Sequence, residues 1–184
     1  GVEGGGNPDE AEQITRLLSP TENFDYFSYG QGNFSLSLEN HVPDLYFEEG
    51  HFIDLHKRMR EAANGVPVMA LGRIGTPELA EEIIENGNGD LVGMSRALIS
   101  DPALPKKALQ GDIKNIRPCV FDNFAWGEIH LGKPLTEHHN PYLGKEGEAF
   151  PKLLSAEYAK RVLVLGGGPS GLEAAWVAAA RGHG

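Results

Sequence analysis

The sequence predicts an α/β protein with a parallel sheet covered by helices. Short apolar runs alternate along the chain with stretches of helical spacing, and several of these stretches carry a capping residue and a terminating glycine. Strands buried on both faces are expected to be apolar throughout, and βα alternation is typical of parallel sheets. A second observation is that the alternation breaks over 112–160 and resumes at 161–181, which indicates more than one structural unit.

The first predicted helix lies near the N-terminus. Asn7 is a suitable N-cap, Pro8 fits the first helical position, and acidic residues fill the first turn. The apolar positions expected to share one face are Ile14, Leu17 and Leu18. The aromatic stretch 24–30 follows and predicts a buried strand that runs into a long loop.

The next predicted helix covers 51–64. Its apolar positions are Phe52, Leu55, Met59, Ala62 and Ala63. Gly65 is placed to end this helix, and the apolar run at 66–74 then predicts a strand buried on both faces.

Two further βα steps are predicted. Thr76 as N-cap and Pro77 at the first position open a helix that ends near Gly87. A buried strand at 90–94 follows, and Asp101 is expected to cap a helix over 102–110.

The predicted organisation has three parts. Residues 1–111 form the βα units, 112–160 form an irregular linker rich in His, Gly, Pro and aromatic residues, and 161–184 begin a new strand–turn–helix unit. The sequence starts without Met and ends just after this unit, so we expect a fragment of a longer protein.

Composition excludes several classes of protein. The net charge of −10 argues against a nucleic-acid-binding protein, which normally has a basic face. A single cysteine excludes an internal disulfide framework and suits a reducing compartment, so a cytoplasmic location is expected. No apolar run approaches the roughly 20 residues of a membrane-spanning helix, and we expect no membrane association.

Two consecutive predicted strands end in the same chemistry. Gly72-Arg73 follows the strand at 67–71 within the apolar run 66–74, and Ser95-Arg96 follows the strand at 90–94. A glycine lets backbone N–H groups approach a phosphate, and an arginine supplies a bidentate cation. The loops after the last two strands of a (β/α)8 barrel are the usual place for a phosphate site. The alternative is that both arginines form ordinary surface salt bridges.

A second candidate phosphate site is the Gly-rich turn "GGGPSG". Gly166, Gly168 and Gly171 stand in a G-x-G-x-x-G pattern between an apolar run and an Ala-rich helix. This context is typical of dinucleotide binding, in which the helix N-terminus stabilises a pyrophosphate. The alternative is a turn without a ligand.

The order of these motifs resembles a known family. Residues 66–112, the "IRPC" of 116–119, the "NP" of 140–141 and "KRVLVLGGGPSGLEAA" at 160–175 are similar to old yellow enzyme-like NADH:flavin oxidoreductases. The resemblance is to the multidomain branch that includes trimethylamine dehydrogenase and 2,4-dienoyl-CoA reductase.

The resemblance implies the C-terminal part of an FMN-binding (β/α)8 TIM barrel, a linker, and the first βα unit of a Rossmann-like domain. It implies that the FMN phosphate is held by Gly72, Arg73, Ser95 and Arg96. It also implies that Gly166, Gly168 and Gly171 open a domain for FAD or another adenine dinucleotide.

The family also implies a [4Fe–4S] cluster on four cysteines, and here the sequence departs from it. Cys119 matches the first ligand, the second falls on Asp122, the third on Ala125 or Trp126, and the fourth on Glu137 or His138. One thiolate cannot hold such a cluster. We therefore expect no cluster and no metal, and we regard a substitute site of Asp122, His138 and His139 as unsuited to iron–sulfur chemistry.

The implied activity is that of an FMN-dependent oxidoreductase acting on a small amine or on an activated alkene, with NAD(P)H or another electron carrier as partner. A homo-oligomer is possible on the sequence alone. The alternative is a truncated flavin- or nucleotide-binding piece without activity. The catalytic residues are not predicted, but Tyr29, Asn33 and His41 are candidates for lining a substrate pocket.

Overall fold

The computed structural model describes residues 4–145, 147 and 154–184. The chain divides into two compact units, Gly1–Pro141 and Tyr142–Gly184. The division predicted at residues 111 and 160 stays a prediction, and part of the predicted linker, residues 146 and 148–153, lies outside the described residues.

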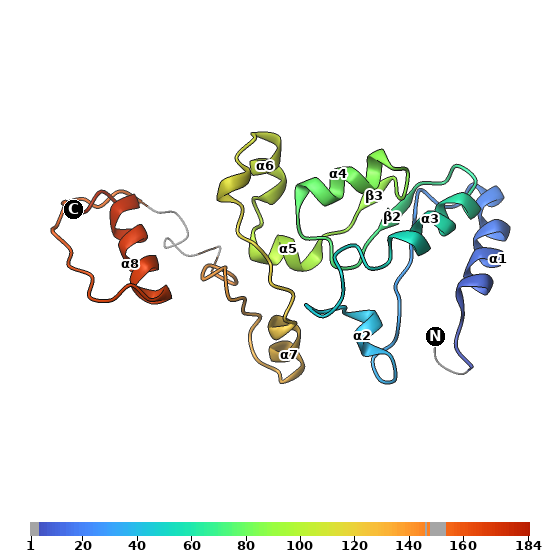
Figure 1. Cartoon of the computed structure of the whole chain (residues 1–184), viewed down its shortest axis with the longest axis horizontal. Helices are drawn as coiled ribbons and strands as arrows, with labels where there is room; N and C mark the ends of the chain where they lie inside the picture. Colours follow the sequence, from blue (N-terminus) through green and yellow to red (C-terminus); the bar gives the residue numbers. More distant parts are fainter. Residues whose placement is uncertain (1–3, 146, 148–153) are drawn as a thin grey trace. The chain divides into compact units, whose positions relative to one another are not determined.

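A three-stranded parallel sheet in the order β1-β2-β3 confirms the predicted α/β architecture (Figure 1). The strands are β1 (Phe27–Ser28), β2 (Val68–Ala70) and β3 (Leu91–Val92). Phe27 pairs with Val68, and Met69 pairs with Leu91. The strands are shorter than predicted; after β2 the chain leaves the sheet at Gly72, which has a positive φ of 109°.

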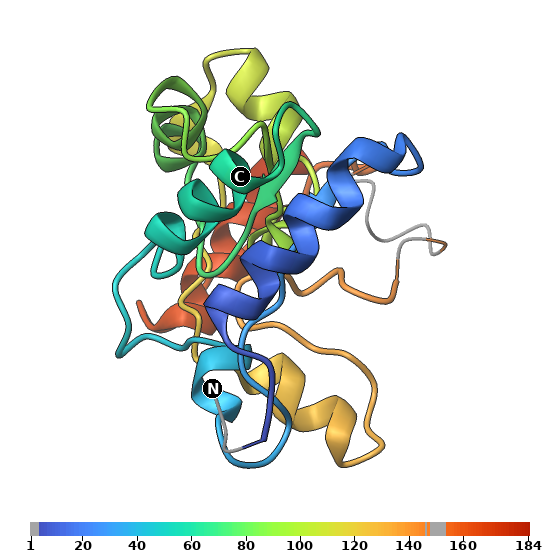
Figure 2. The same cartoon turned by 90° about the vertical axis from the view of Figure 1, so that its right-hand side faces the viewer.

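Helices pack beside these strands in the first unit. They are α1 (Pro8–Leu18), α2 (Leu38–His41), α3 (Ile53–Ala62), α4 (Pro77–Glu85), α5 (Ser95–Ser100), α6 (Leu104–Leu109) and α7 (Phe124–His130), with 3-10 turns at Ser19–Thr21 and Ile113–Asn115. Figures 1 and 2 both show α1 lying beside α3. A small core cluster of Ala70, Ile74 and Ile83 joins β2 to α4.

The N-terminal helix begins as predicted but faces differently. Asn7 forms a full capping box with Glu10. Ile14 and Leu17, predicted to face the core, are 55% and 74% exposed. The reason is that α1 meets α3 through polar side chains: Arg58 of α3 donates to Glu12 at 2.6 Å.

Around β3 the structure corrects the predicted helix boundaries. Residues 95–100 form α5, a helix that the sequence did not predict. Its residues Ala97 and Ser100 are buried on one face. The helix predicted over 102–110 begins at Leu104 instead. Asp101 is not its N-cap. Instead, its carboxylate accepts hydrogen bonds from Ala103, Lys107 and Arg117.

The segment predicted to be irregular contains α7. Four rings, Phe34, His41, Trp126 and His130, hold this helix against the loop after β1, with ring centroids 3.9 to 6.4 Å apart. Sequence periodicity does not predict this contact, because it joins residues far apart along the chain.

In the second unit, residues 161–165 form no assigned strand, contrary to prediction, and α8 (Pro169–Ala180) follows the Gly-rich turn. The N–H of Val162 donates to the carbonyl of Gly184 at 2.7 Å, and the N–H of Gly184 donates to Lys160 at 2.9 Å. These two bonds have the pattern of parallel strands. They involve only one residue of the partner segment, too few for a ladder.

Candidate functional site

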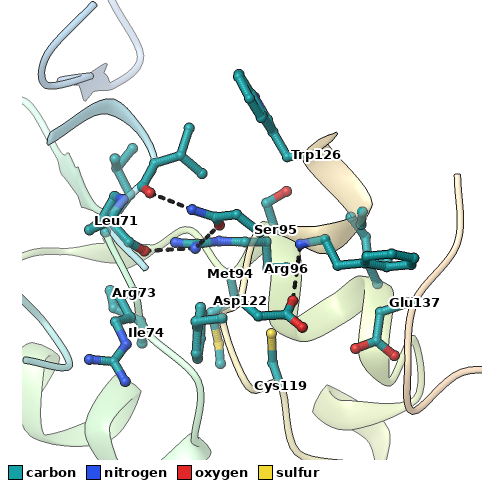
Figure 3. A pocket seen from close by; sticks show the side chains of 18 of the residues that line it. Leu71, Arg73, Ile74, Met94, Ser95, Arg96, Cys119, Asp122, Trp126 and Glu137 are labelled. Carbon is teal, nitrogen blue, oxygen red and sulfur yellow. Dashed lines mark hydrogen bonds between the residues drawn. The ribbon is translucent and has the colours of Figure 1, made fainter. Parts of the chain in front are cut away.

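A cavity of about 570 Å³ lies beyond the carboxyl ends of β2 and β3 (Figure 3). Its walls come from four stretches: 41–43, 71–74, 93–96 and parts of 119–138. The loops that follow neighbouring parallel strands meet at one edge of a sheet, which is where ligands bind in such folds. All four residues predicted to hold a phosphate, Gly72, Arg73, Ser95 and Arg96, line this cavity.

The turn after β2 requires glycine at its first position. Gly72 has φ 109°, and a Cβ there would lie 2.6 Å from the ring of Phe52. The next residue, Arg73, also has a positive φ of 53°. Its Nε is buried and has no hydrogen-bond partner. The turn therefore presents a cationic side chain whose donor capacity is not used within the chain.

The second arginine is held in place by neutral acceptors. The Nη1 of Arg96 donates to the carbonyl of Pro43 at 2.7 Å and to the Oδ1 of Asn123 at 2.6 Å. Asn123 in turn donates to the carbonyl of Val42 at 2.7 Å. Figure 3 draws these hydrogen bonds as dashed lines beside Arg96, in the wall of the cavity. Burial, with the nearby positive charge of Arg73, lowers the pKa of Arg96 from its usual value.

Neither arginine forms an ion pair within the described part of the chain, so the alternative of ordinary salt bridges is wrong for both. Instead, both guanidinium groups lie over the ring of Phe121, with the Cζ of Arg73 5.5 Å and that of Arg96 4.7 Å from its centroid. Cations contact an aromatic face favourably, but a ring carries no net charge. Asp122 and Glu137 also line the cavity, but neither pairs with these two guanidinium groups, so both positive charges are available to an anion such as a phosphate.

The positions that the family resemblance assigns to cluster ligands also lie in the lining of this cavity. Its lining includes Cys119, Asp122, Ala125, Trp126, Glu137 and His138. The Nε2 of His138 lies 2.8 Å from Asp122, and its ring stacks on Phe124 at 4.4 Å. Among residues 4–145 and 154–184, no group of three or more His, Cys, Asp or Glu side chains is arranged to hold a metal. One thiol with an acid–histidine pair does not fit a four-thiolate iron–sulfur cluster.

The three candidates for a substrate pocket do not share one cavity. His41 lines the cavity above, whereas Tyr29 and Asn33 line another, of about 770 Å³, beside α1. The hydroxyl of Tyr29 meets that of Thr15 at 2.7 Å, and burial raises its pKa. The Oδ1 of Asn33 accepts the N–H groups of Ser35 and Leu36, which gives it a role in the local turn.

Sequence reasoning missed Phe121 and Asn123 at this site. Both have a positive φ, 55° and 59° respectively, and both contact Arg96. No periodicity marks them. The only indication in the sequence is their position beside Cys119, in the segment to which the resemblance assigns the cluster ligands.

The Gly-rich turn of the second unit has the geometry its glycines suggest. Gly166 has φ 111°, and a Cβ on Gly171 would lie 2.1 Å from the carbonyl oxygen of Gly166. Gly168 is the N-cap of α8 and offers no side chain to the helix N-terminus. The first N–H groups of α8 are therefore not capped by a side chain at that position.

Part of the chain that forms this site is similar to known proteins. Residues 47–115 match the NADH:flavin oxidoreductase / NADH oxidase family. This stretch belongs to that family. The resemblance inferred from the sequence is confirmed, and the match contains all four predicted phosphate residues.

Three similar proteins extend the match beyond these residues. An NADH oxidase of Thermoanaerobacter brockii is 35% identical over 184 residues, which is 99% of this chain and 28% of that protein. A solved 2-naphthoyl-CoA reductase in complex with 2-naphthoyl-CoA superposes with a TM-score of 0.89 at 28% identity, covering 99% of this chain and 27% of that one. A histamine dehydrogenase from Rhizobium sp. 4-9 gives a TM-score of 0.81 at 28% identity, covering 93% and 25%.

The chain thus spans about a quarter of the length of these relatives. In the part of the chain that is described, no helix is long and apolar enough to cross a bilayer.

Proposed function

We propose that the whole protein is an FMN-dependent oxidoreductase and that the cavity beyond β2 and β3 holds the FMN phosphate. The observation that carries this proposal is the pair of guanidinium groups of Arg73 and Arg96, which line one cavity without a carboxylate partner. The family match over the same residues supports FMN as the anion's source. The similarity to oxidoreductases disfavours the alternative of a piece without activity.

Each residue has a defined part in this proposal. Gly72 lets the backbone come close to the phosphate, and Arg73 contributes a charge with an unused buried donor. Arg96 is fixed by Pro43 and Asn123 and keeps its remaining N–H groups for the ligand. Ser95 at the start of α5 adds a hydroxyl donor. Bound FMN would supply the hydride transfer, while the chain binds and orients it.

The substrate class is an amine or an activated alkene. The similar solved structures support an amine or a reducible substrate, because one is a histamine dehydrogenase and the other a 2-naphthoyl-CoA reductase. Electrons would be exchanged with NAD(P)H or another acceptor, consistent with the NADH oxidase relative. Within this proposal we favour amine demethylation, which the family resemblance implies for a chain without the cysteines that would relay single electrons through a cluster.

The second unit is proposed to begin a domain for FAD or another adenine dinucleotide. Gly166 and Gly171 occupy positions where a side chain is disfavoured, which leaves the turn open to a pyrophosphate. Gly168 leaves the N-terminus of α8 uncapped, and such a helix end favours an anion. A location in the cytoplasm and a homo-oligomeric state stay predictions.

Replacing Arg96 tests the phosphate site. In the whole protein, Arg96→Ala should weaken FMN binding by about 1.5–3 kcal/mol, because a charge-assisted contact is removed. The measurement is titration of apoprotein with FMN, followed by quenching of flavin fluorescence. Arg16→Ala is the matched control, since Arg16 pairs with Glu12 on the surface of α1 and should leave the affinity unchanged. Equal FMN affinity in Arg96→Ala and the wild type would refute the assignment.

Metal analysis tests the expected loss of the cluster. Protein purified without oxygen should contain flavin but no stoichiometric iron or acid-labile sulfide, because Cys119 is the only cysteine of this chain and the other three implied ligand positions hold other residues. A visible spectrum of flavin alone would accompany this result. Four irons per chain would show that the segment around Cys119 still binds a cluster.

A further inference from the structure

Phe121 adopts a backbone conformation that is unfavourable for its residue type. It has φ 55°, in the left-handed region, and its side chain is buried, with only 4% of the residue exposed. A bulky aromatic residue rarely occupies this region, whereas glycine does so at no steric cost. Such a conformation persists only where the surrounding structure holds it in place. The contacts of the Phe121 ring must therefore hold this conformation in place.

The ring of Phe121 is packed against the two strand ends that carry the arginines. A Cβ on Gly75 would lie 2.8 Å from the Cε2 of Phe121, so this glycine leaves the space that the ring needs. The guanidinium groups of Arg73 and Arg96 both lie over the same ring. No other aromatic ring of the described chain is recorded in contact with a cation.

The neighbouring residue serves the same arginine. Asn123, two positions further along and also left-handed with φ 59°, accepts from Arg96 through its side chain. The backbone of 121–123 thus takes two unusual conformations, and each brings a side chain to Arg96. Packing alone does not require this, because an apolar side chain in an ordinary conformation can also fill a core.

The arrangement brings together two positive charges that no ion pair of the described chain neutralises. Neither guanidinium forms an ion pair in the described ranges, and Arg96 donates only to an amide oxygen and a backbone carbonyl. The face of an aromatic ring attracts cations and restricts their movement, but it leaves their N–H groups available at the edge. A ring in this place can therefore hold two guanidinium groups in fixed positions for an anion.

We propose that Phe121 is a positioning residue for flavin binding, whose ring fixes the guanidinium groups of Arg73 and Arg96 so that they meet the phosphate of FMN. This inference rests on the proposed function, because it takes FMN as the ligand of the cavity. If the inference is right, loss of the Phe121 ring should weaken the binding of FMN, which carries the phosphate, and not the binding of a flavin that lacks it. A residue that only fills the core would affect both.

The test compares FMN with riboflavin, which lacks the phosphate, in the whole protein. Phe121→Leu keeps a branched apolar side chain and removes the aromatic face. Two lost cation–π contacts should weaken FMN binding about 5- to 30-fold, while riboflavin binding stays within about twofold of the wild type. Phe47→Leu is the matched control. The ring of Phe47 packs against His51 rather than an arginine and does not line this cavity, so neither affinity should change.

The outcomes separate the inference from the function on which it rests. If the wild type binds FMN no better than riboflavin, the proposed phosphate site fails. If the wild type prefers FMN but Phe121→Leu keeps that full preference, or loses affinity for both flavins equally, the positioning role is wrong. Should Phe121→Leu not fold, Phe121→Gly relieves the left-handed backbone and repeats the comparison. If neither variant binds riboflavin, the ring is structural and the inference is overturned.

Discussion

Asp101 is the residue that joins the end of α5 to the segment carrying Cys119. It is 3% exposed and accepts hydrogen bonds from the Nζ of Lys107 at 2.6 Å and from the N–H of Arg117 at 2.9 Å. A third bond comes from the N–H of Ala103. Burial alone would raise the pKa of this carboxyl, but these donors outweigh it and lower the pKa below its usual value.

The direction of this pKa shift gives a pH dependence. Because the folded pKa is lowered, Asp101 contributes stability that is present above the unfolded pKa, near 3.8, and is lost as the pH falls through the folded value. At pH 7, Asp101→Asn should reduce the local opening free energy around Arg117 by about 1–3 kcal/mol. The difference from the wild type should shrink as the pH falls below about 4, because the carboxyl of the opened state is protonated there before the folded one.

Hydrogen exchange of residues 101–117 in the whole protein measures this effect. Asp54→Asn is the control, since Asp54 lies exposed on α3 and no hydrogen bond is recorded for its side chain. A difference between Asp101→Asn and the wild type that is as large at pH 3 as at pH 7 would contradict the role given to the charged carboxylate.

At the scale of elements, α4 follows the loop of Arg73 and anchors it to the core. Thr76 caps the helix by accepting the N–H of Leu79 at 3.2 Å, as predicted, and Ile83 buries the helix against Ala70 and Ile74. The chain between Arg73 and the cap is only two residues long. The cap therefore fixes where the turn at Arg73 ends.

Removing the cap should loosen this helix start. Thr76→Ala should destabilise the first turn of α4 by about 1 kcal/mol, because the N–H of Leu79 loses its acceptor. The faster exchange should be confined to amides at the beginning of α4. Thr76→Ser retains the hydroxyl and should exchange like the wild type; if it exchanges like the alanine variant, the hydroxyl does not act as a cap.

Elements encoded by local residues could be predicted from the sequence, and elements set by distant contacts could not. Asn7, Thr76 and Gly87 mark helix ends through capping or a positive φ, and the apolar run around β2 marks a buried strand. By contrast, α7 packs through rings that come from a loop about 90 residues earlier. The pairing of residues 160–162 with Gly184 likewise depends on a partner far along the chain.

The candidate site follows the same division. Gly72, Arg73, Ser95 and Arg96 could be predicted because they follow predicted strands, and parallel strands end at one edge. Their lack of acidic partners and the ring of Phe121 could not, because these depend on how 119–126 folds back onto the sheet.

At the scale of the whole molecule, the chain exposes much apolar surface. The large exposed side chains include Ile14, Leu17, Leu36, Leu163, Leu165 and Trp176. Within the described residues the sheet has three strands, so β1 and β3 each have an unpaired edge. Since the chain covers about a quarter of its relatives, these surfaces are candidates for burial by the rest of the protein.

The isolated 184 residues should therefore associate rather than form a compact monomer. Open strand edges and exposed apolar patches both favour association, and a single strand-and-helix unit buries too little surface to offset the entropy of ordering it. Light scattering after size-exclusion chromatography should give a mass that rises with concentration. Hydrogen exchange should find the described residues between 112 and 160, together with 161–165, the least protected. A compact monomer with slow exchange at 161–165 would mean that these residues fold independently, and the exposed surfaces would then need another explanation.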